Sequence, residues 1–270
     1  MALRQKIQNG VFGLLDAADV MLGRKSPLTP PRRLMNVGSN SIFRNDFTAI
    51  GDTLLGYLTN IGGLKPDDRV LDIGCGVGRM AIAMTRYLKT GSYDGFDIVK
   101  TSIDYCEQAI TPKHPNFRFR HADIQNSNYN RHGVIRPADF RFPYPDRAFT
   151  FVFLTSVFTH MQREEVEQYL AEISRVLAPG GRVVATYFLL NPDSYESMAT
   201  GTSGQAFAYA TDKGRVEIEH DPDAAVAFEE VYVAGMYPTN SMQITMVKYG
   251  SWSGRKSEVG YQDIIVAVRG

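Results

Sequence analysis

The stretch Val70-Leu-Asp-Ile-Gly-Cys-Gly-Val-Gly78, followed by a helix-compatible run from Arg79 to Leu88, predicts a buried strand, a glycine turn and a helix N-terminus. Glycines at positions 74, 76 and 78 keep side chains out of the turn, so the backbone can lie directly against a polar ligand. The stretch therefore indicates a cofactor site in an α/β protein.

A second candidate strand, Tyr93-Asp-Gly-Phe-Asp97-Ile98, ends in a carboxylate nineteen residues after Gly78. A carboxylate at this place suits the two hydroxyls of a ribose. Dinucleotide-binding units also carry an acid about 20 residues beyond their glycine turn. The turn and Asp97 together therefore specify a nucleoside and leave the reaction open.

Two later motifs distinguish between adenosine cofactors. His121-Ala-Asp123-Ile124 places a second acid after the strand-like Phe117–Arg120, and Pro-Gly-Gly at 179–181 separates a helix from a strand. With these motifs, roughly residues 50–190 resemble the class I S-adenosylmethionine-dependent methyltransferases. An NAD-linked oxidoreductase is disfavoured because the turn reads Gly-x-Gly-x-Gly and not Gly-x-Gly-x-x-Gly.

The resemblance implies S-adenosylmethionine as the cofactor and assigns its contacts by position. It puts the glycine turn against the methionyl end, Asp97 on the ribose hydroxyls, and Asp123 with Ile124 beside the adenine, while Asp72 braces the turn. The predicted cofactor-binding residues are Asp72, Gly74, Cys75, Gly76, Gly78, Asp97, Ile98, Asp123 and Ile124.

Methyl transfer to a hydroxyl benefits from a base that removes the proton. His160 is the predicted catalytic residue because it stands in Leu154-Thr-Ser-Val-Phe-Thr-His160-Met161, just after the fourth strand. A histidine at this place can equally hold a loop without moving a proton. The predicted acceptor-binding residues are Arg44, Asn126, Tyr129 and Asn130.

The motifs and composition also limit the acceptor. No Asn-Pro-Pro-Tyr or Asp-Pro-Pro-Tyr follows the fourth strand, which disfavours DNA and protein-amide methylation, and the 29 basic and 29 acidic residues give no field for nucleic acid. The histidines lack metal-site spacing, so we expect a metal-free mechanism. The chain also resembles bacterial methyltransferases of sugar modification, which predicts O-methylation of a small molecule or saccharide. A SAM-binding regulatory or scaffold protein is the alternative.

The pattern of elements predicts an α/β fold, namely a doubly wound, seven-stranded, mostly parallel Rossmann-like sheet with an antiparallel last strand. Strands are expected near 69–73, 93–98, 117–120, 149–154, 182–190, 242–249 and 261–268, and helices near 43–58, 79–89, 101–109, 163–177 and 225–236. Residues 1–40 form a predicted N-terminal helix and proline-rich connector, and residues 41–270 a methyltransferase domain with an inserted loop and hairpin at about 191–222.

The sequence indicates a cytoplasmic protein, because it has no run of 18 apolar residues, no signal-peptide core and only two cysteines. Residues 1–25 contain an amphipathic helix that permits contact with a membrane surface. Because Asp16 and Asp19 weaken attraction to anionic lipid, the sequence favours a helix that caps its own domain or a dimer mate. The sequence leaves the oligomeric state open.

Overall fold

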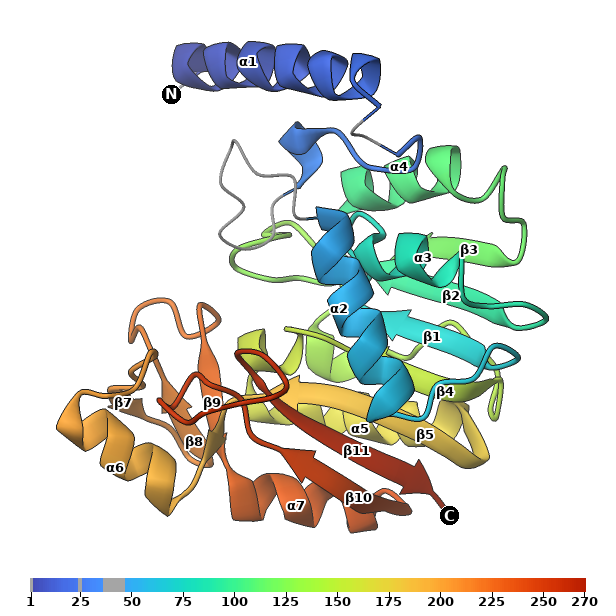
Figure 1. Cartoon of the computed structure of the whole chain (residues 1–270). Coiled ribbons are helices and arrows are strands. Elements are labelled where there is room, and N and C mark those ends of the chain that lie inside the picture. The colour runs from blue at the N-terminus through green and yellow to red at the C-terminus, as the bar shows by residue number, and fades with distance from the viewer. Residues whose placement is uncertain (1, 24–25, 36–46) are drawn as a thin grey trace.

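A seven-stranded sheet forms the centre of the molecule, with strands in the spatial order β10-β11-β5-β4-β1-β2-β3 (Figure 1). The computed structural model describes residues 2–23, 26–35 and 47–270, with side chains from residue 10 onward. The strands are β1 (Arg69–Ile73), β2 (Ser92–Asp97), β3 (Phe117–His121), β4 (Phe149–Leu154), β5 (Leu177–Tyr187), β10 (Met242–Lys248) and β11 (Asp263–Arg269). Six strands run in one direction and β11 alone runs opposite to them, which confirms the predicted Rossmann-like sheet.

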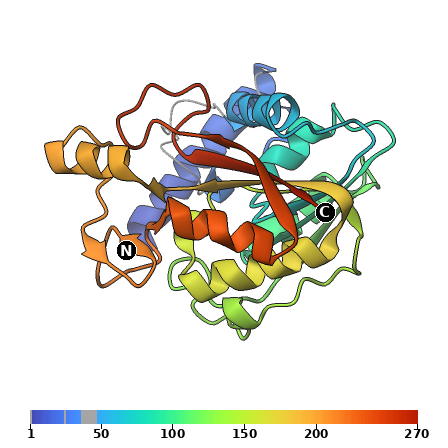
Figure 2. The same ribbon diagram turned by 90° about the horizontal axis from the view of Figure 1, so that it is seen from below.

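Helices cover both faces of this sheet (Figures 1 and 2). One face carries α2 (Phe47–Asn60), α3 (Arg79–Met84) and α4 (Lys100–Ala109), and the other carries α5 (Arg163–Val176) and α7 (Glu230–Thr239). Strand β4 illustrates the pattern, since Phe151 and Phe153 face the first set of helices whereas Val152 and Leu154 face the second. Burial on both faces explains why the inner strands are almost continuously apolar.

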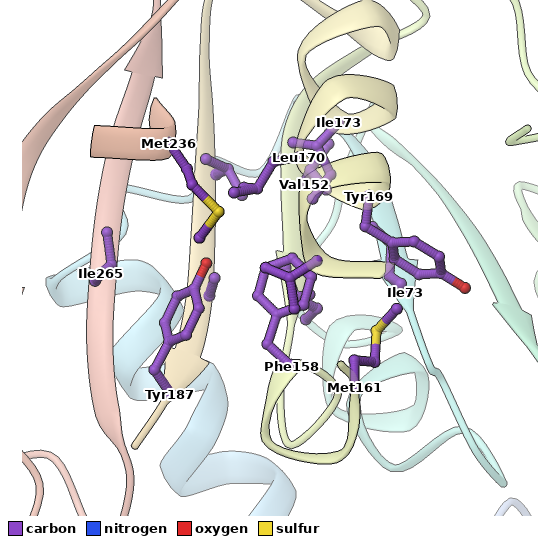
Figure 3. Close-up of a cluster of buried hydrophobic side chains, with 14 of the residues drawn as sticks. Ile73, Val152, Phe158, Met161, Tyr169, Leu170, Ile173, Tyr187, Met236 and Ile265 are labelled. Atoms are coloured by element: carbon purple, nitrogen blue, oxygen red, sulfur yellow. The ribbon is translucent and has the colours of Figure 1, made fainter. Parts of the chain in front are cut away.

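The core on the α5 side reaches the carboxyl ends of the strands (Figure 3). The ring of Phe158, in the short helix η3 (Phe158–His160), packs 5.1 Å from the ring of Tyr187 on β5. The hydroxyl of Tyr187 forms a hydrogen bond of 3.1 Å with the hydroxyl of Tyr237. This packing fixes the segment that follows β4, on which His160 stands.

The segment after β5 builds a second, smaller sheet of order β6-β9-β8-β7. Its strands are β6 (Leu189–Leu190), β7 (Tyr209–Ala210), β8 (Gly214–Val216) and β9 (Val226–Glu229), and α6 (Pro192–Thr200) precedes β7. The helix expected over 225–236 is wrong in its first part, because Val226–Glu229 pairs with β6 and β8. A short apolar run does not distinguish a strand from a helix, and the neighbouring strands decide here.

The carboxylate of Asp263 joins the small sheet to the main sheet. It accepts hydrogen bonds of 2.7 Å from the backbone N–H groups of Leu189 and Gly250 and from the indole Nε1 of Trp252. Burial raises the pKa of Asp263 to about 6, while these three donors favour the charged form. The start of β11 thereby anchors both β6 and the connection between β10 and β11.

The N-terminal helix α1 (Ala2–Met21) lies across one end of the molecule, away from the sheet (Figure 1). Its principal partner is the short helix η1 (Arg32–Leu34). Among the described residues, no helix has the length and apolar character needed to cross a membrane. The predicted domain boundary at residue 40 falls in 36–46, outside the described residues.

Candidate functional site: a cofactor cleft at the carboxyl edge of the sheet

The glycine turn follows β1 at the carboxyl edge, where β1 lies between β2 and β4. The backbone N–H groups of Gly74 and Cys75 donate to the carbonyl oxygen of Phe96, at 2.9 and 3.1 Å. Gly76 adopts a positive φ of 53°, and a Cβ atom there would meet open space. The turn thus offers a ligand close approach to its backbone surface, while its first N–H groups are engaged by β2.

Gly78 has a different role in the same turn. It precedes α3 with a φ of 78°, and a Cβ atom would lie 2.8 Å from Ile110 and 3.0 Å from Cys106. A side chain at this position would push α3 away from α4. Gly78 therefore permits close helix packing, and it lines neither of the two cavities described below.

Asp97 ends β2 beside the turn. Its Oδ2 atom accepts a hydrogen bond of 2.8 Å from the backbone N–H of Gly76, and its Oδ1 atom accepts one of 2.8 Å from Val99. Burial raises the pKa of Asp97, and the two backbone N–H groups partly offset that effect. Each oxygen keeps a further lone pair, so the carboxylate can still accept bonds from a diol.

Asp72 lies beneath the turn and is almost fully buried. The hydroxyl of Tyr93 donates a short hydrogen bond to its carboxylate. Burial raises the pKa of Asp72 to about 7, although the bond from Tyr93 and the charge of Arg79 act in the opposite direction. Asp72 and Arg79 therefore supply an acid and a cation beside the turn, complementary to the ammonium and carboxylate of an amino acid.

Two cavities meet at the turn, and both are lined in part by Gly74, Gly76 and Ser156. The Asp97 cavity, of about 440 Å³, also has Asp97, Ile98 and Ile124 on its walls. The α2 cavity, of about 650 Å³, lies between α2, the ends of β1 and β5, and the segment before β11. Of the predicted cofactor-binding residues, Asp72 and Cys75 also line the α2 cavity. Most of the predicted cofactor residues thus surround one continuous cleft.

Asp123 contributes to the cleft only indirectly. It lines neither cavity, and its Oδ1 atom accepts a hydrogen bond of 3.0 Å from the side-chain amide of Asn130. The same amide donates to the carbonyl oxygen of Ile124 at 3.0 Å. Asp123 and Asn130 therefore hold the loop that presents Ile124 to the Asp97 cavity.

The other predicted acceptor residues differ in position. Asn126 and Tyr129 line the Asp97 cavity, where the Oδ1 atom of Asn126 also accepts a backbone N–H from Tyr129 at 3.0 Å. Arg44 lies outside the described residues. Among the described residues, no three His, Cys, Asp or Glu side chains are grouped so as to hold a metal ion.

His160 lines the Asp97 cavity and is half-buried. Its Nδ1 atom lies 3.0 Å from the carbonyl oxygen of Asp223, and its ring meets that of Tyr129 edge-on with centroids 6.3 Å apart. A carbonyl oxygen only accepts, so this contact favours the tautomer with the proton on Nδ1. The Nε2 atom then carries a free lone pair.

Sequence reasoning missed a polar group at the junction of the cavities. Ser156 has a positive φ of 57°, its backbone N–H donates to Thr186 Oγ1 at 2.8 Å, and its hydroxyl donates to Gln262 Oε1 at 3.0 Å. A non-glycine residue in this conformation is uncommon and often marks a functional site. No local signal links positions 156, 186 and 262, because only the folded sheet brings them together.

A second missed residue is Glu165, which also lines the Asp97 cavity. Its carboxylate accepts a hydrogen bond of 2.7 Å from the backbone N–H of Gln162 and so caps α5. Burial raises the pKa of Glu165 to about 7. In the sequence it resembles an ordinary capping-box acid, which conceals its position on the cavity wall.

Comparison with known proteins agrees with this geometry. Residues 70–181 match a family model described as a methyltransferase domain. The chain is 33% identical over 146 residues to the 27-O-demethylrifamycin SV methyltransferase of Amycolatopsis mediterranei, which covers 54% of this chain and 46% of that protein. It is 29% identical over 177 residues to the sterol 24-C-methyltransferase erg6 of Schizosaccharomyces pombe, covering 65% and 42%. The chain thus spans less than half the length of these two relatives.

A solved structure, the PH0226 protein from Pyrococcus horikoshii, superposes with a TM-score of 0.57 at 15% identity, covering 84% of this chain and 93% of that chain. This likeness concerns the fold. The strand order, the glycine turn followed by an acid at the end of β2, and the family match together identify the cofactor as S-adenosylmethionine. Residues 70–181 therefore form a methyltransferase domain, on the Rossmann-like sheet predicted for the class I S-adenosylmethionine-dependent enzymes.

Proposed function

We propose that this chain is an O-methyltransferase that acts on a hydroxyl of a small molecule. The observation that carries the proposal is the position of His160, which lines the same cavity as Asp97. Its Nδ1 atom contacts the carbonyl oxygen of Asp223, which leaves the Nε2 atom free to accept a proton. A hydroxyl must lose its proton as it is methylated, and a neutral histidine within reach can accept that proton. Carbon and thiol acceptors also release a proton, so the labelling experiment tests the choice of oxygen.

The residues on the cleft fit the two ends of the cofactor. Asp97 would hold the ribose hydroxyls, and Ile98 and Ile124 would border the adenine in the Asp97 cavity. Asp72 and Arg79 would hold the methionyl end in the α2 cavity. When bound, the cofactor would supply a methyl group on a sulfonium.

The residues of the chain then have three tasks. Thr155 and Ser156, at the junction, orient the acceptor hydroxyl at roughly 3 Å from the methyl group. His160, which lines the Asp97 cavity together with Thr155 and Ser156, accepts the proton that the hydroxyl releases at the junction as its oxygen takes the methyl group. Helix α2 lines one side of the α2 cavity.

The walls of the α2 cavity favour an acceptor with an apolar body. Leu54 and Leu58 of α2 and Val184 of β5 line it, and Gln262 and Thr186 add polar groups near the junction. A free sugar would bury several hydroxyls against these aliphatic side chains without partners, and each such loss costs free energy. We therefore favour a small molecule with an apolar ring or chain that presents one hydroxyl, and a saccharide is the other outcome of the test.

The test supplies methyl-labelled S-adenosylmethionine and the small-molecule fraction of a cell extract to the full chain, followed by isolation of the labelled product. Treatment with hydroiodic acid cleaves methyl ethers and leaves methyl groups on carbon in place. We expect the label to be released as methyl iodide from a product that partitions into organic solvent. Label retained on carbon contradicts the hydroxyl acceptor, and absence of any transfer points to a cofactor-binding protein without catalysis. The Asp97→Ala variant serves as the background.

A further inference from the structure

Helix α1 carries an exposed apolar stripe. Val11, Leu14 and Met21 have exposed fractions of 45%, 75% and 88%, and their spacing puts them on one side of the helix. In the sequence, Ile7 continues the same spacing. The opposite side of α1, with Asp16 and the half-buried Phe12, faces η1. The stripe therefore points away from the body of the protein and has the character of an interaction surface.

The charge of the chain is unevenly distributed. Residues 1–33 contain six basic and two acidic side chains, whereas residues 34–270 contain 23 basic and 27 acidic ones. The overall balance of zero thus conceals a positive N-terminal segment attached to a negative domain. A positive segment with an apolar stripe is suited to a surface that is both apolar and anionic.

The two acids of α1 face away from that surface. Arg32 donates to Asp16 Oδ1 at 2.9 Å and to Asp19 Oδ2 at 2.5 Å, and its backbone N–H also donates to Asp16 Oδ2 at 3.1 Å. The carboxylates are therefore neutralised on the body side of the helix. Because Arg32 pairs with Asp16 and Asp19, these acids repel an anionic lipid surface less than the sequence alone predicts.

A second copy of the helix is a poorer partner for the stripe. In the sequence, basic residues stand near both ends of α1. Arg4 and Lys6 fall in its first two turns, and Arg24 and Lys25 follow its last residue, Met21. Pairing two such helices brings positive charge against positive charge in the parallel and in the antiparallel orientation. The compensating acids are engaged by Arg32.

We propose that α1 is an interfacial helix that docks the chain on an anionic lipid surface. The helix, about 30 Å long, lies along the headgroup region with Leu14 and Met21 inserted, and the net positive charge of residues 1–33 adds attraction to the anionic headgroups. Docking adds to the proposed methyl transfer and does not depend on it, because no described side chain of α1, from residue 10 to residue 21, lines either cavity.

The experiment measures cosedimentation of the full chain with vesicles of phosphatidylcholine alone and of phosphatidylcholine with phosphatidylserine. We expect binding to the anionic vesicles only, weakened at high salt because the charges are screened. Replacing Leu14→Asp and Met21→Asp together should weaken binding by roughly tenfold or more, because the inserted apolar area is lost. Val231→Asp on α7, where the side chain is 85% exposed, is the matched control and should bind like the parent chain.

Three results overturn the proposal. One is absence of binding to anionic vesicles, and another is binding that the double variant retains. The third is a parent chain that is dimeric in solution and does not bind vesicles, together with a double variant that is monomeric. That result assigns the stripe to contact with a second copy of the chain. Binding of S-adenosylhomocysteine by the double variant serves as the check that the domain is still folded.

Discussion

The carboxylate of Asp97 connects the end of β2 to the glycine turn, because its Oδ2 atom accepts the backbone N–H of Gly76 at 2.8 Å. The same carboxylate is the predicted partner of the ribose hydroxyls. Asp97 thus shapes the backbone of the glycine turn and, as the predicted ribose ligand, would also contact the cofactor. A change at this position should therefore act on affinity by both routes.

Replacing Asp97→Ala should weaken S-adenosylhomocysteine binding by roughly ten- to hundredfold, the equivalent of about 1.5–3 kcal/mol for a lost bond to a charged acceptor. Calorimetry measures the change, and a thermal unfolding curve checks that the variant remains folded. Asp104→Ala is the control, because Asp104 is an exposed acid on α4 that pairs with Lys100. An unchanged dissociation constant in Asp97→Ala would remove this residue from the cofactor site.

Replacing His160→Ala should lower turnover by about 10²–10⁴-fold while cofactor affinity changes little, since a general base acts in the chemical step. The His160→Gln variant keeps a hydrogen-bonding side chain but cannot take the proton. Single-turnover rates on the identified acceptor measure both. If His160→Gln reacts as fast as the parent chain, His160 only positions the acceptor or the loop near Asp223.

Replacing Gln262→Ala should raise the KM for the acceptor by about tenfold and leave the dissociation constant of S-adenosylhomocysteine unchanged, because one polar contact to the acceptor is lost. The motivation is the hydrogen bond between Ser156 and Gln262 at the junction of the cavities. Gln243→Ala, at an exposed position of β10, is the matched control. A fall in kcat with constant KM would contradict a binding role.

The raised pKa of Asp72 predicts a pH-dependent stability. Its folded value of about 7 lies above the ordinary value near 3.8, so the folded chain binds the proton more tightly than the unfolded chain does. The stabilising contribution is complete below about pH 4 and is lost as the pH rises through about 7. Asp72→Asn keeps an acceptor for Tyr93 and remains neutral throughout.

Chemical denaturation of the unliganded chain tests this expectation. Relative to the parent chain, Asp72→Asn should gain free energy of unfolding between about pH 5 and about pH 8. Glu165 and Asp263 also have raised pKa values, but they contribute equally to both proteins. The difference therefore reports on Asp72 together with Asp97, whose charge acts on it. A difference that does not change with pH would show that Asp72 is ionised in the folded state across this range.

Deleting residues 1–25 should change the dissociation constant of S-adenosylhomocysteine by no more than about twofold, since none of the described side chains of this segment, those of residues 10–23, lines either cavity. The deletion removes Asp16 and Asp19, which form ion pairs with Arg32, but Arg32 lies outside the sheet core. Calorimetry on the shortened chain provides the measurement. A shortened chain that does not fold would assign α1 to the structural core.

The sequence predicted the sheet because its strands carry strong local signals. The run Val70–Gly78 and the acid at Asp97 locate β1, the turn and β2, and residues 72–77 and Asp97 line the cleft. The strand over Val226–Glu229 was assigned to a helix, since its pairing with β6 and β8 depends on residues distant in the chain. For the same reason, the contact between Ser156 and Gln262, 106 positions apart, has no signature in the sequence.

Asp263 limits how this protein can be recombined with its relatives. The segment after β5 builds the small sheet, and it looks exchangeable as a cassette because it is one continuous run of chain between β5 and α7. Its first strand, however, relies on the carboxylate of Asp263 through Leu189, and that carboxylate also satisfies Gly250 and Trp252. A chimera that exchanges residues 188–229 alone keeps this arrangement only if the new segment supplies a matching N–H group. Segments 188–229 and 249–263 are therefore best transplanted together, as one discontinuous unit.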